Sequence, residues 1–100
     1  MIDKIDHLGI VVRNLDDSIQ LYKDSLGLEY MGREVVPDGT VEVAFFKIGE
    51  SKIELIQPLN NPGVDRFLET RGEGLHHICV ETDNIEAELE RMEKCWCTPH

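Results

Sequence analysis

No stretch of this 100-residue sequence is apolar over a length that would cross a membrane. The longest apolar run extends only from Leu8 to Val12, whereas a membrane helix needs about 20 residues. The N-terminus carries charges at Asp3, Lys4 and Asp6, where a secretory signal peptide would be apolar. We therefore expect a cytoplasmic protein without a membrane partner.

Basic residues are also scarce, since Lys and Arg number 10 against 20 Asp and Glu, for a formal net charge of −10. The basic residues are scattered and form no basic segment, which argues against a nucleic-acid partner. The three cysteines, Cys79, Cys95 and Cys97, have no framework spacing, and Cys95 and Cys97 together with His100 suit no standard structural zinc site. We predict no disulfide. The sequence also has no glycine-rich phosphate loop and no nucleophile elbow.

The apolar pattern predicts one α+β domain, a βαβββ module followed by a partial second βα module. Asn14 is placed as the N-cap of a first helix, whose apolar stripe is Leu15, Ile19, Tyr22 and Leu26. The predicted strands lie at residues 5–12, 28–36, 40–48, 52–57 and 75–82. Two more helices are predicted, a short one around residues 64–68 and a last one at about residues 85–96.

The first strand and helix recur about seventy residues later in the sequence. This shift places His7 on His77 and Asn14 on Asn84, and it aligns the apolar stripes of the first and last helices. Within a single domain at residues 1–100, the predicted parts are a complete module at 1–58, a connector at 59–74 and a partial module at 75–100. We therefore expect a truncated or frame-shifted chain that lacks three strands and leaves a sheet edge exposed.

Two histidines at equivalent positions of repeated strands indicate a metal site, because a pseudo-twofold axis would bring His7 and His77 to one point. The repeat selects His77 over His76, which strand alternation places on the opposite face. Glu54 lies among apolar strand neighbours, where a metal ion or a cationic side chain would compensate its charge. A partly exposed strand face explains Glu54 equally well.

A second acidic residue, Glu42, is similarly placed in its own strand. If the turn at residues 49–51 pairs Ile48 with Lys52, then Glu42 and Glu54 lie on the same face of the sheet.

Three segments resemble the vicinal oxygen chelate (glyoxalase/bleomycin resistance) superfamily. They are DHLGIVV at residues 6–12, KIELIQP at residues 52–58 and RGEGLHHI at residues 71–78. Within this superfamily the sequence is most similar to the methylmalonyl-CoA epimerases, over residues 3–94. The resemblance implies a glyoxalase-like fold, a divalent cobalt, zinc or manganese ion, and a homodimer.

Carried onto this sequence, the family's metal ligands are His7, Glu54 and His77, and a fourth would lie about seventy residues after Glu54, beyond the chain. The resemblance implies an isomerase that interconverts the 2R and 2S forms of methylmalonyl-CoA by proton exchange at C2. The metal would stabilise the negative charge that develops, and Glu42 would be one catalytic base.

Several alternatives stay open on the sequence. The truncated chain is inactive, or two chains build one site from the His7 and Glu54 of each partner. The chemistry is that of a glyoxalase I-type lactoylglutathione lyase, which shares the His, Glu and His ligands, or the chain is a non-catalytic module that binds a small molecule. The position of the coenzyme A carrier and the identity of the metal are not determined.

Overall fold

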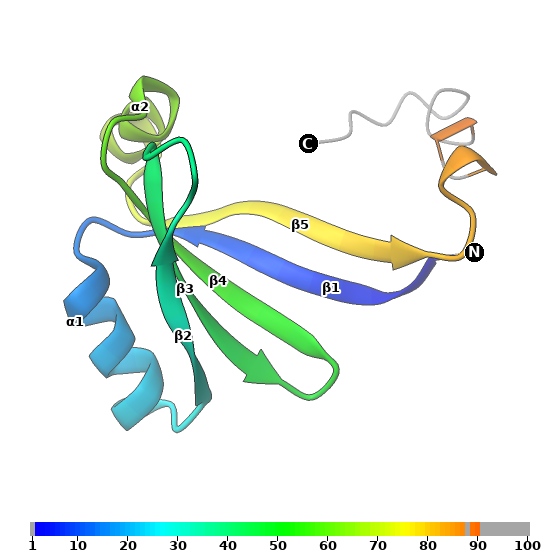
Figure 1. Cartoon of the computed structure of the whole chain (residues 1–100), viewed down its shortest axis with the longest axis horizontal. Helices are drawn as coiled ribbons and strands as arrows, with labels where there is room; N and C mark the ends of the chain where they lie inside the picture. The colour runs from blue at the N-terminus through cyan, green and yellow to red at the C-terminus, as the bar shows by residue number, and fades with distance from the viewer. Residues whose placement is uncertain (1, 88, 91–100) are drawn as a thin grey trace.

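A computed structural model describes residues 2–87 and 89–90. The chain forms one five-stranded sheet with two helices packed on it, an α+β fold as predicted (Figure 1). The elements are β1 (Ile2–Val11), α1 (Leu15–Gln20), the π-helix η1 (Leu21–Ser25), β2 (Glu29–Val35), β3 (Val41–Ile48), β4 (Ser51–Pro58), α2 (Pro62–Arg71) and β5 (Gly74–Thr82).

The predicted order of elements is confirmed as far as β5. Of the last predicted helix, residues 85–87 and 89–90 are helical, while residue 88 and residues 91–96 lie outside the described residues, as do Cys95 and Cys97. Among the described residues, no helix has the length and apolarity that a membrane crossing needs.

The strand order is β2-β3-β4-β1-β5, with β1 parallel to β4 and all other neighbours antiparallel. β1 pairs with β4 only from His7 to Val11, whereas its pairing with β5 begins at Ile2. The start of β1 and the end of β5 therefore extend from the sheet as a two-stranded ribbon (Figure 1). Side chains of β4, β1 and β5 meet only along the second half of β1.

The sheet buries apolar side chains on both faces, and this burial is the main favourable contribution to folding. The cluster on the α1 face consists of Val12, Leu15, Ile19, Ala44, Phe46 and Leu55. The cluster on the α2 face consists of Val11, Val43, Ile56, Val64 and Leu68. Because strand side chains alternate, neighbouring residues of one strand belong to opposite clusters, as Val43 and Ala44 do.

The first helix begins as predicted but ends differently. The Asn14 side chain accepts a hydrogen bond of 3.0 Å from the backbone N–H of Asp17, so the predicted N-cap is confirmed. Leu26 was expected on the buried stripe, but it is 59% exposed. The cause is the π-helix, in which the N–H of Leu26 donates to the carbonyl of Leu21. This wider turn rotates Leu26 off the stripe.

The β3–β4 turn corrects a predicted register. The sequence is compatible with a pairing of Ile48 with Lys52, but Ile48 pairs with Ser51 across a two-residue turn. The glycine of this turn has a φ of 58°, a conformation that glycine adopts at little cost. Since a shift of one residue moves every side chain to the other face, Glu42 and Glu54 lie on opposite faces of the sheet, and the expectation that they share one is wrong.

Candidate metal site

Three side chains from three adjacent strands converge at one point of the α2 face. They are His7 on β1, Glu54 on β4 and His77 on β5. The Nε2 atoms of the two histidines are 3.2 Å apart. The nearer Glu54 oxygen, Oε1, is 4.0 Å from the Nε2 of His7 and 3.7 Å from that of His77. The structure therefore brings together the three residues that are predicted from the sequence to be metal ligands.

Strand register explains this convergence. Gly9 pairs with Glu54 on one side and with His77 on the other, so these residues form one row across the sheet. His7 is two residues before Gly9 on the same strand and so points to the same face. The His77 ring occupies the space above Gly9, because a Cβ built there would lie 2.5 Å from both ring nitrogens. Only glycine leaves room for this imidazole.

A carboxylate orients the His7 ring. The Nδ1 of His7 is 2.8 Å from an Asp6 oxygen, and because an ionised carboxylate only accepts hydrogen bonds, this nitrogen carries the proton. The hydrogen bond from His7 holds the pKa of Asp6 below its usual value, even though partial burial acts in the opposite sense. The Nε2 lone pair of His7 is thereby directed at Glu54 and His77.

The electrostatics at His77 favour a neutral imidazole. Partial burial lowers its pKa below 6.5, and the nearby rings of His7 and His76 lower it further, while the Glu54 carboxylate acts in the opposite sense. A neutral imidazole has the lone pair that a metal ion requires.

His76 does not lie on the face of β5 that strand alternation predicts. Strand alternation placed it opposite to His77, but its ring packs edge-on against both His77 and Phe67, whose side chain belongs to the α2 face. The reason is a β-bulge, since Gly9 pairs with His77 and the next residue, Ile10, pairs with Leu75. His76 is left without a strand partner and is free to turn toward α2.

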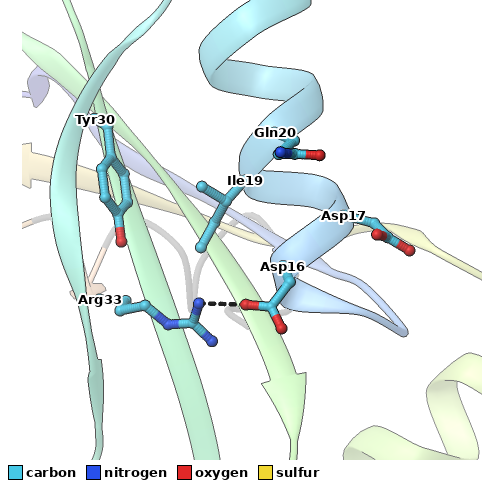
Figure 2. A pocket seen from close by; sticks show the side chains of 6 residues that line it. All are labelled: Asp16, Asp17, Ile19, Gln20, Tyr30 and Arg33. Atoms are coloured by element: carbon cyan, nitrogen blue, oxygen red, sulfur yellow. Dashed lines mark hydrogen bonds and ion pairs between the residues drawn. The ribbon is translucent and has the colours of Figure 1, made fainter.

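Glu42 belongs to a different cluster on the α1 face. Its carboxylate accepts a hydrogen bond of 2.9 Å from the Nε of Arg33, and Arg33 also forms an ion pair with Asp16 on α1. Figure 2 shows the Arg33–Asp16 pair beside a pocket between α1 and β2. The two carboxylates raise the pKa of Arg33 above its usual value. This position does not bring Glu42 to the converging histidines.

The converging donor atoms fit a divalent metal ion. Two imidazole nitrogens and a carboxylate oxygen are the donors that zinc, cobalt and manganese accept in proteins. Ligands at about 2.0–2.2 Å from such an ion stand roughly 3–3.5 Å apart, close to the separations of 3.2 to 4.0 Å in the structure. Each side chain is about one fifth to one quarter exposed, so the site is open to a small molecule.

Comparison of the sequence with known protein families identifies the class of protein to which this fold and site belong. The model of the glyoxalase/bleomycin resistance protein/dioxygenase superfamily matches residues 6–98. The chain belongs to this superfamily, and the predicted membership is confirmed.

Proteins with similar sequences include some that are named for an enzymatic activity and some that are named as uncharacterised. The chain is 38% identical over 91 residues to the uncharacterised protein YqjC of Bacillus subtilis, covering 90% of this chain and 65% of YqjC. It is 32% identical over 93 residues to the human mitochondrial methylmalonyl-CoA epimerase, covering 91% of this chain and 53% of the human protein. A probable lactoylglutathione lyase of Synechocystis is 31% identical over 87 residues, with coverage of 86% and 65%. The chain thus spans about half to two thirds of these relatives.

A solved structure shares the fold. A variant of the Streptomyces coelicolor methylmalonyl-CoA epimerase, in complex with 2-nitronate-propionyl-CoA, superimposes with a TM-score of 0.81 at 29% identity. The match covers 96% of this chain and 74% of that one.

Proposed function

We propose that this chain holds a divalent metal ion through His7, Glu54 and His77 and acts as an isomerase at C2 of methylmalonyl-CoA. The observation that carries the proposal is the convergence of these three donors from three adjacent strands. Relatives named methylmalonyl-CoA epimerase support the substrate class. Cobalt, zinc and manganese all suit the donor set.

A bound metal ion would act as a Lewis acid and stabilise the negative charge that develops on substrate oxygens when a base takes the C2 proton, before a proton returns to the opposite face of C2. The chain's own groups prepare the site for this chemistry. Asp6 accepts the Nδ1 proton of His7 in a hydrogen bond, and burial lowers the pKa of His77, which favours its neutral form. The prediction that Glu42 is one catalytic base stays a prediction; its carboxylate lies on the sheet face opposite to the three proposed ligands, where it accepts a hydrogen bond from Arg33.

Two measurements test this proposal in sequence. Metal titration should show binding to the wild-type chain and much weaker binding to Glu54→Gln, since an amide is a weaker ligand than a carboxylate. Lys47→Gln is the matched control, because Lys47 is an exposed residue of β3. Deuterium incorporation at C2 of methylmalonyl-CoA in heavy water then tests the reaction. Metal binding without isotope exchange would refute the isomerase function of this chain.

A lactoylglutathione lyase is the second candidate, because the Synechocystis relative has that probable activity. An assay with the glutathione hemithioacetal separates the two enzymes. Binding of a small molecule without either reaction would instead establish a non-catalytic module.

We also propose a homodimer. Apolar side chains of β1 and of the edge strand β5 are exposed, among them Ile5 at 44%, Leu75 at 53% and Ile78 at 50%. Such a surface on an edge strand favours association. Sedimentation equilibrium should give twice the chain mass, and a monomer would refute this.

A further inference from the structure

A second concave site lies between α2 and β5, beside the candidate metal site. Its volume is about 420 Å³. It is lined by Gly63, Arg66, Phe67, Thr70, Arg71 and His76. Five of these residues form one side of α2, at helical spacings of three and four, and His76 faces them from β5.

This α2–β5 pocket concentrates positive charge on a protein with a net charge of −10. Arg66 and Arg71 are both exposed, and within residues 2–87 and 89–90 neither guanidinium forms an ion pair with a carboxylate. Arg33 provides the contrast, since its guanidinium already binds two carboxylates. The guanidinium of Arg71 lies 5.8 Å from the centre of the Phe67 ring, which holds it against the pocket wall.

The pocket adjoins the candidate metal site through His76. The His76 ring centre is 5.0 Å from that of Phe67, and its Nδ1 is 3.0 Å from the Nδ1 of His77. One elongated molecule would therefore reach both the pocket and the histidines of the metal site.

We propose that the α2–β5 pocket binds the phosphate groups of the coenzyme A carrier, with Arg66 and Arg71 as their ligands. The proposal rests on the acyl-CoA function proposed above. A coenzyme A thioester carries its phosphates on a flexible arm away from the reacting carbons, so it needs a cationic site near the metal but separate from it. Guanidinium groups bind phosphate through two parallel hydrogen bonds, and local cations are required because the acidic protein as a whole repels such an anion.

The test measures binding of coenzyme A to the metal-free chain by calorimetry. Arg66→Ala and Arg71→Ala should each weaken binding about tenfold, because each removes a charge-assisted contact. Lys47→Ala, which removes the same charge from an exposed site on β3, should leave affinity unchanged. Pantetheine, which lacks the phosphates, should bind more weakly than coenzyme A and should not respond to either arginine change.

Four outcomes would overturn the proposal. The first is that coenzyme A does not bind to the wild-type chain, and the second is that both arginine variants bind coenzyme A with unchanged affinity. The third is that Lys47→Ala loses as much coenzyme A affinity as the arginine variants do. The fourth is that glutathione binding depends on the arginines as strongly as coenzyme A binding does. The last would identify carboxylates as the ligands of the pocket.

Isotope exchange at C2 separates this proposal from the function on which it rests. Exchange with an unchanged KM for methylmalonyl-CoA in both arginine variants would refute the pocket and leave the isomerase. Arginine-dependent binding of coenzyme A without exchange would refute the isomerase and leave the pocket.

Discussion

Replacing Gly9 by alanine is the sharpest test of the candidate metal site. A Cβ at this position would lie 2.5 Å from both nitrogens of the His77 ring. Ordinary contacts between such atoms are about 3.5–4.0 Å, so the ring has to move by roughly 1 Å or leave its position. His77 is one of the three proposed metal ligands, and a displacement of about 1 Å at a functional group lowers its effectiveness up to about 100-fold. We expect zinc affinity to fall about 10- to 100-fold.

The free energy of unfolding should respond differently from metal affinity. Gly9 does not have a positive φ, so alanine is compatible with the backbone, and it reduces the freedom of the unfolded chain. When His77 turns outward, the metal-free variant should be as stable as the wild type or more stable by up to about 1 kcal/mol. Urea titration in the presence of a chelator measures this. A large loss of stability would show that the ring cannot move away.

Gly63→Ala is the matched control, because a Cβ there meets only the Asn61 side chain, at 3.4 Å. This variant should bind zinc as the wild type does. Competition with a chromogenic chelator measures affinity in all three proteins. Wild-type zinc affinity in Gly9→Ala would refute the conclusion that His77 reaches the metal over Gly9.

Three further changes test the groups around the site. Asp6→Ala should lower zinc affinity about 10- to 100-fold, because the Nδ1–H of His7 loses its hydrogen-bond acceptor. Asp6→Asn, whose amide oxygen still accepts a hydrogen bond, should lose less affinity. Equal zinc affinities of Asp6→Ala and the wild type would contradict the orienting role of Asp6. Because the pKa of His77 is lowered from 6.5 in the folded protein, the His77 imidazole binds a proton more readily in the unfolded chain than in the folded one. The metal-free protein should therefore lose stability as the pH falls below about 6.5, and urea midpoints on either side of that pH should show a smaller change in His77→Gln than in the wild type. Glu42→Gln should lower the free energy of unfolding, measured by urea titration, by about 0.2–1 kcal/mol, because it weakens the ion pair with Arg33. A simultaneous loss of zinc affinity would disprove the separation of Glu42 from the metal site.

The sequence predicted the candidate ligands through a repeat rather than through local structure. Matching His7 to His77 requires only that the two strands have similar apolar patterns. The carboxylate of Glu54 stood out because an acidic residue among apolar strand neighbours is costly unless it is compensated. The structure places all three donor groups within 4.8 Å of one another.

The errors concern residues whose position depends on pairing between strands. Glu42 changed face because the β3–β4 turn is one residue shorter than the pairing considered for it. His76 turned toward α2 because a bulge interrupts the alternation of β5. The role of Gly9 was missed because a glycine in a strand shows its purpose only when the side chain lying over it is known.

The sequence by itself determined the α+β class, the order of strands and helices and the Asn14 cap, because periodicity and capping are local properties of the chain. It also indicated the three candidate ligands, through the repeat and through the unusual position of Glu54 among apolar residues. Tertiary structure alone decided that Glu42 lies on the face opposite to the histidines, how Asp6 orients His7, and where Arg66 and Arg71 form a pocket. These features depend on register and on contacts between residues distant in sequence. A change of one residue in a turn or a bulge reverses them without altering the local pattern.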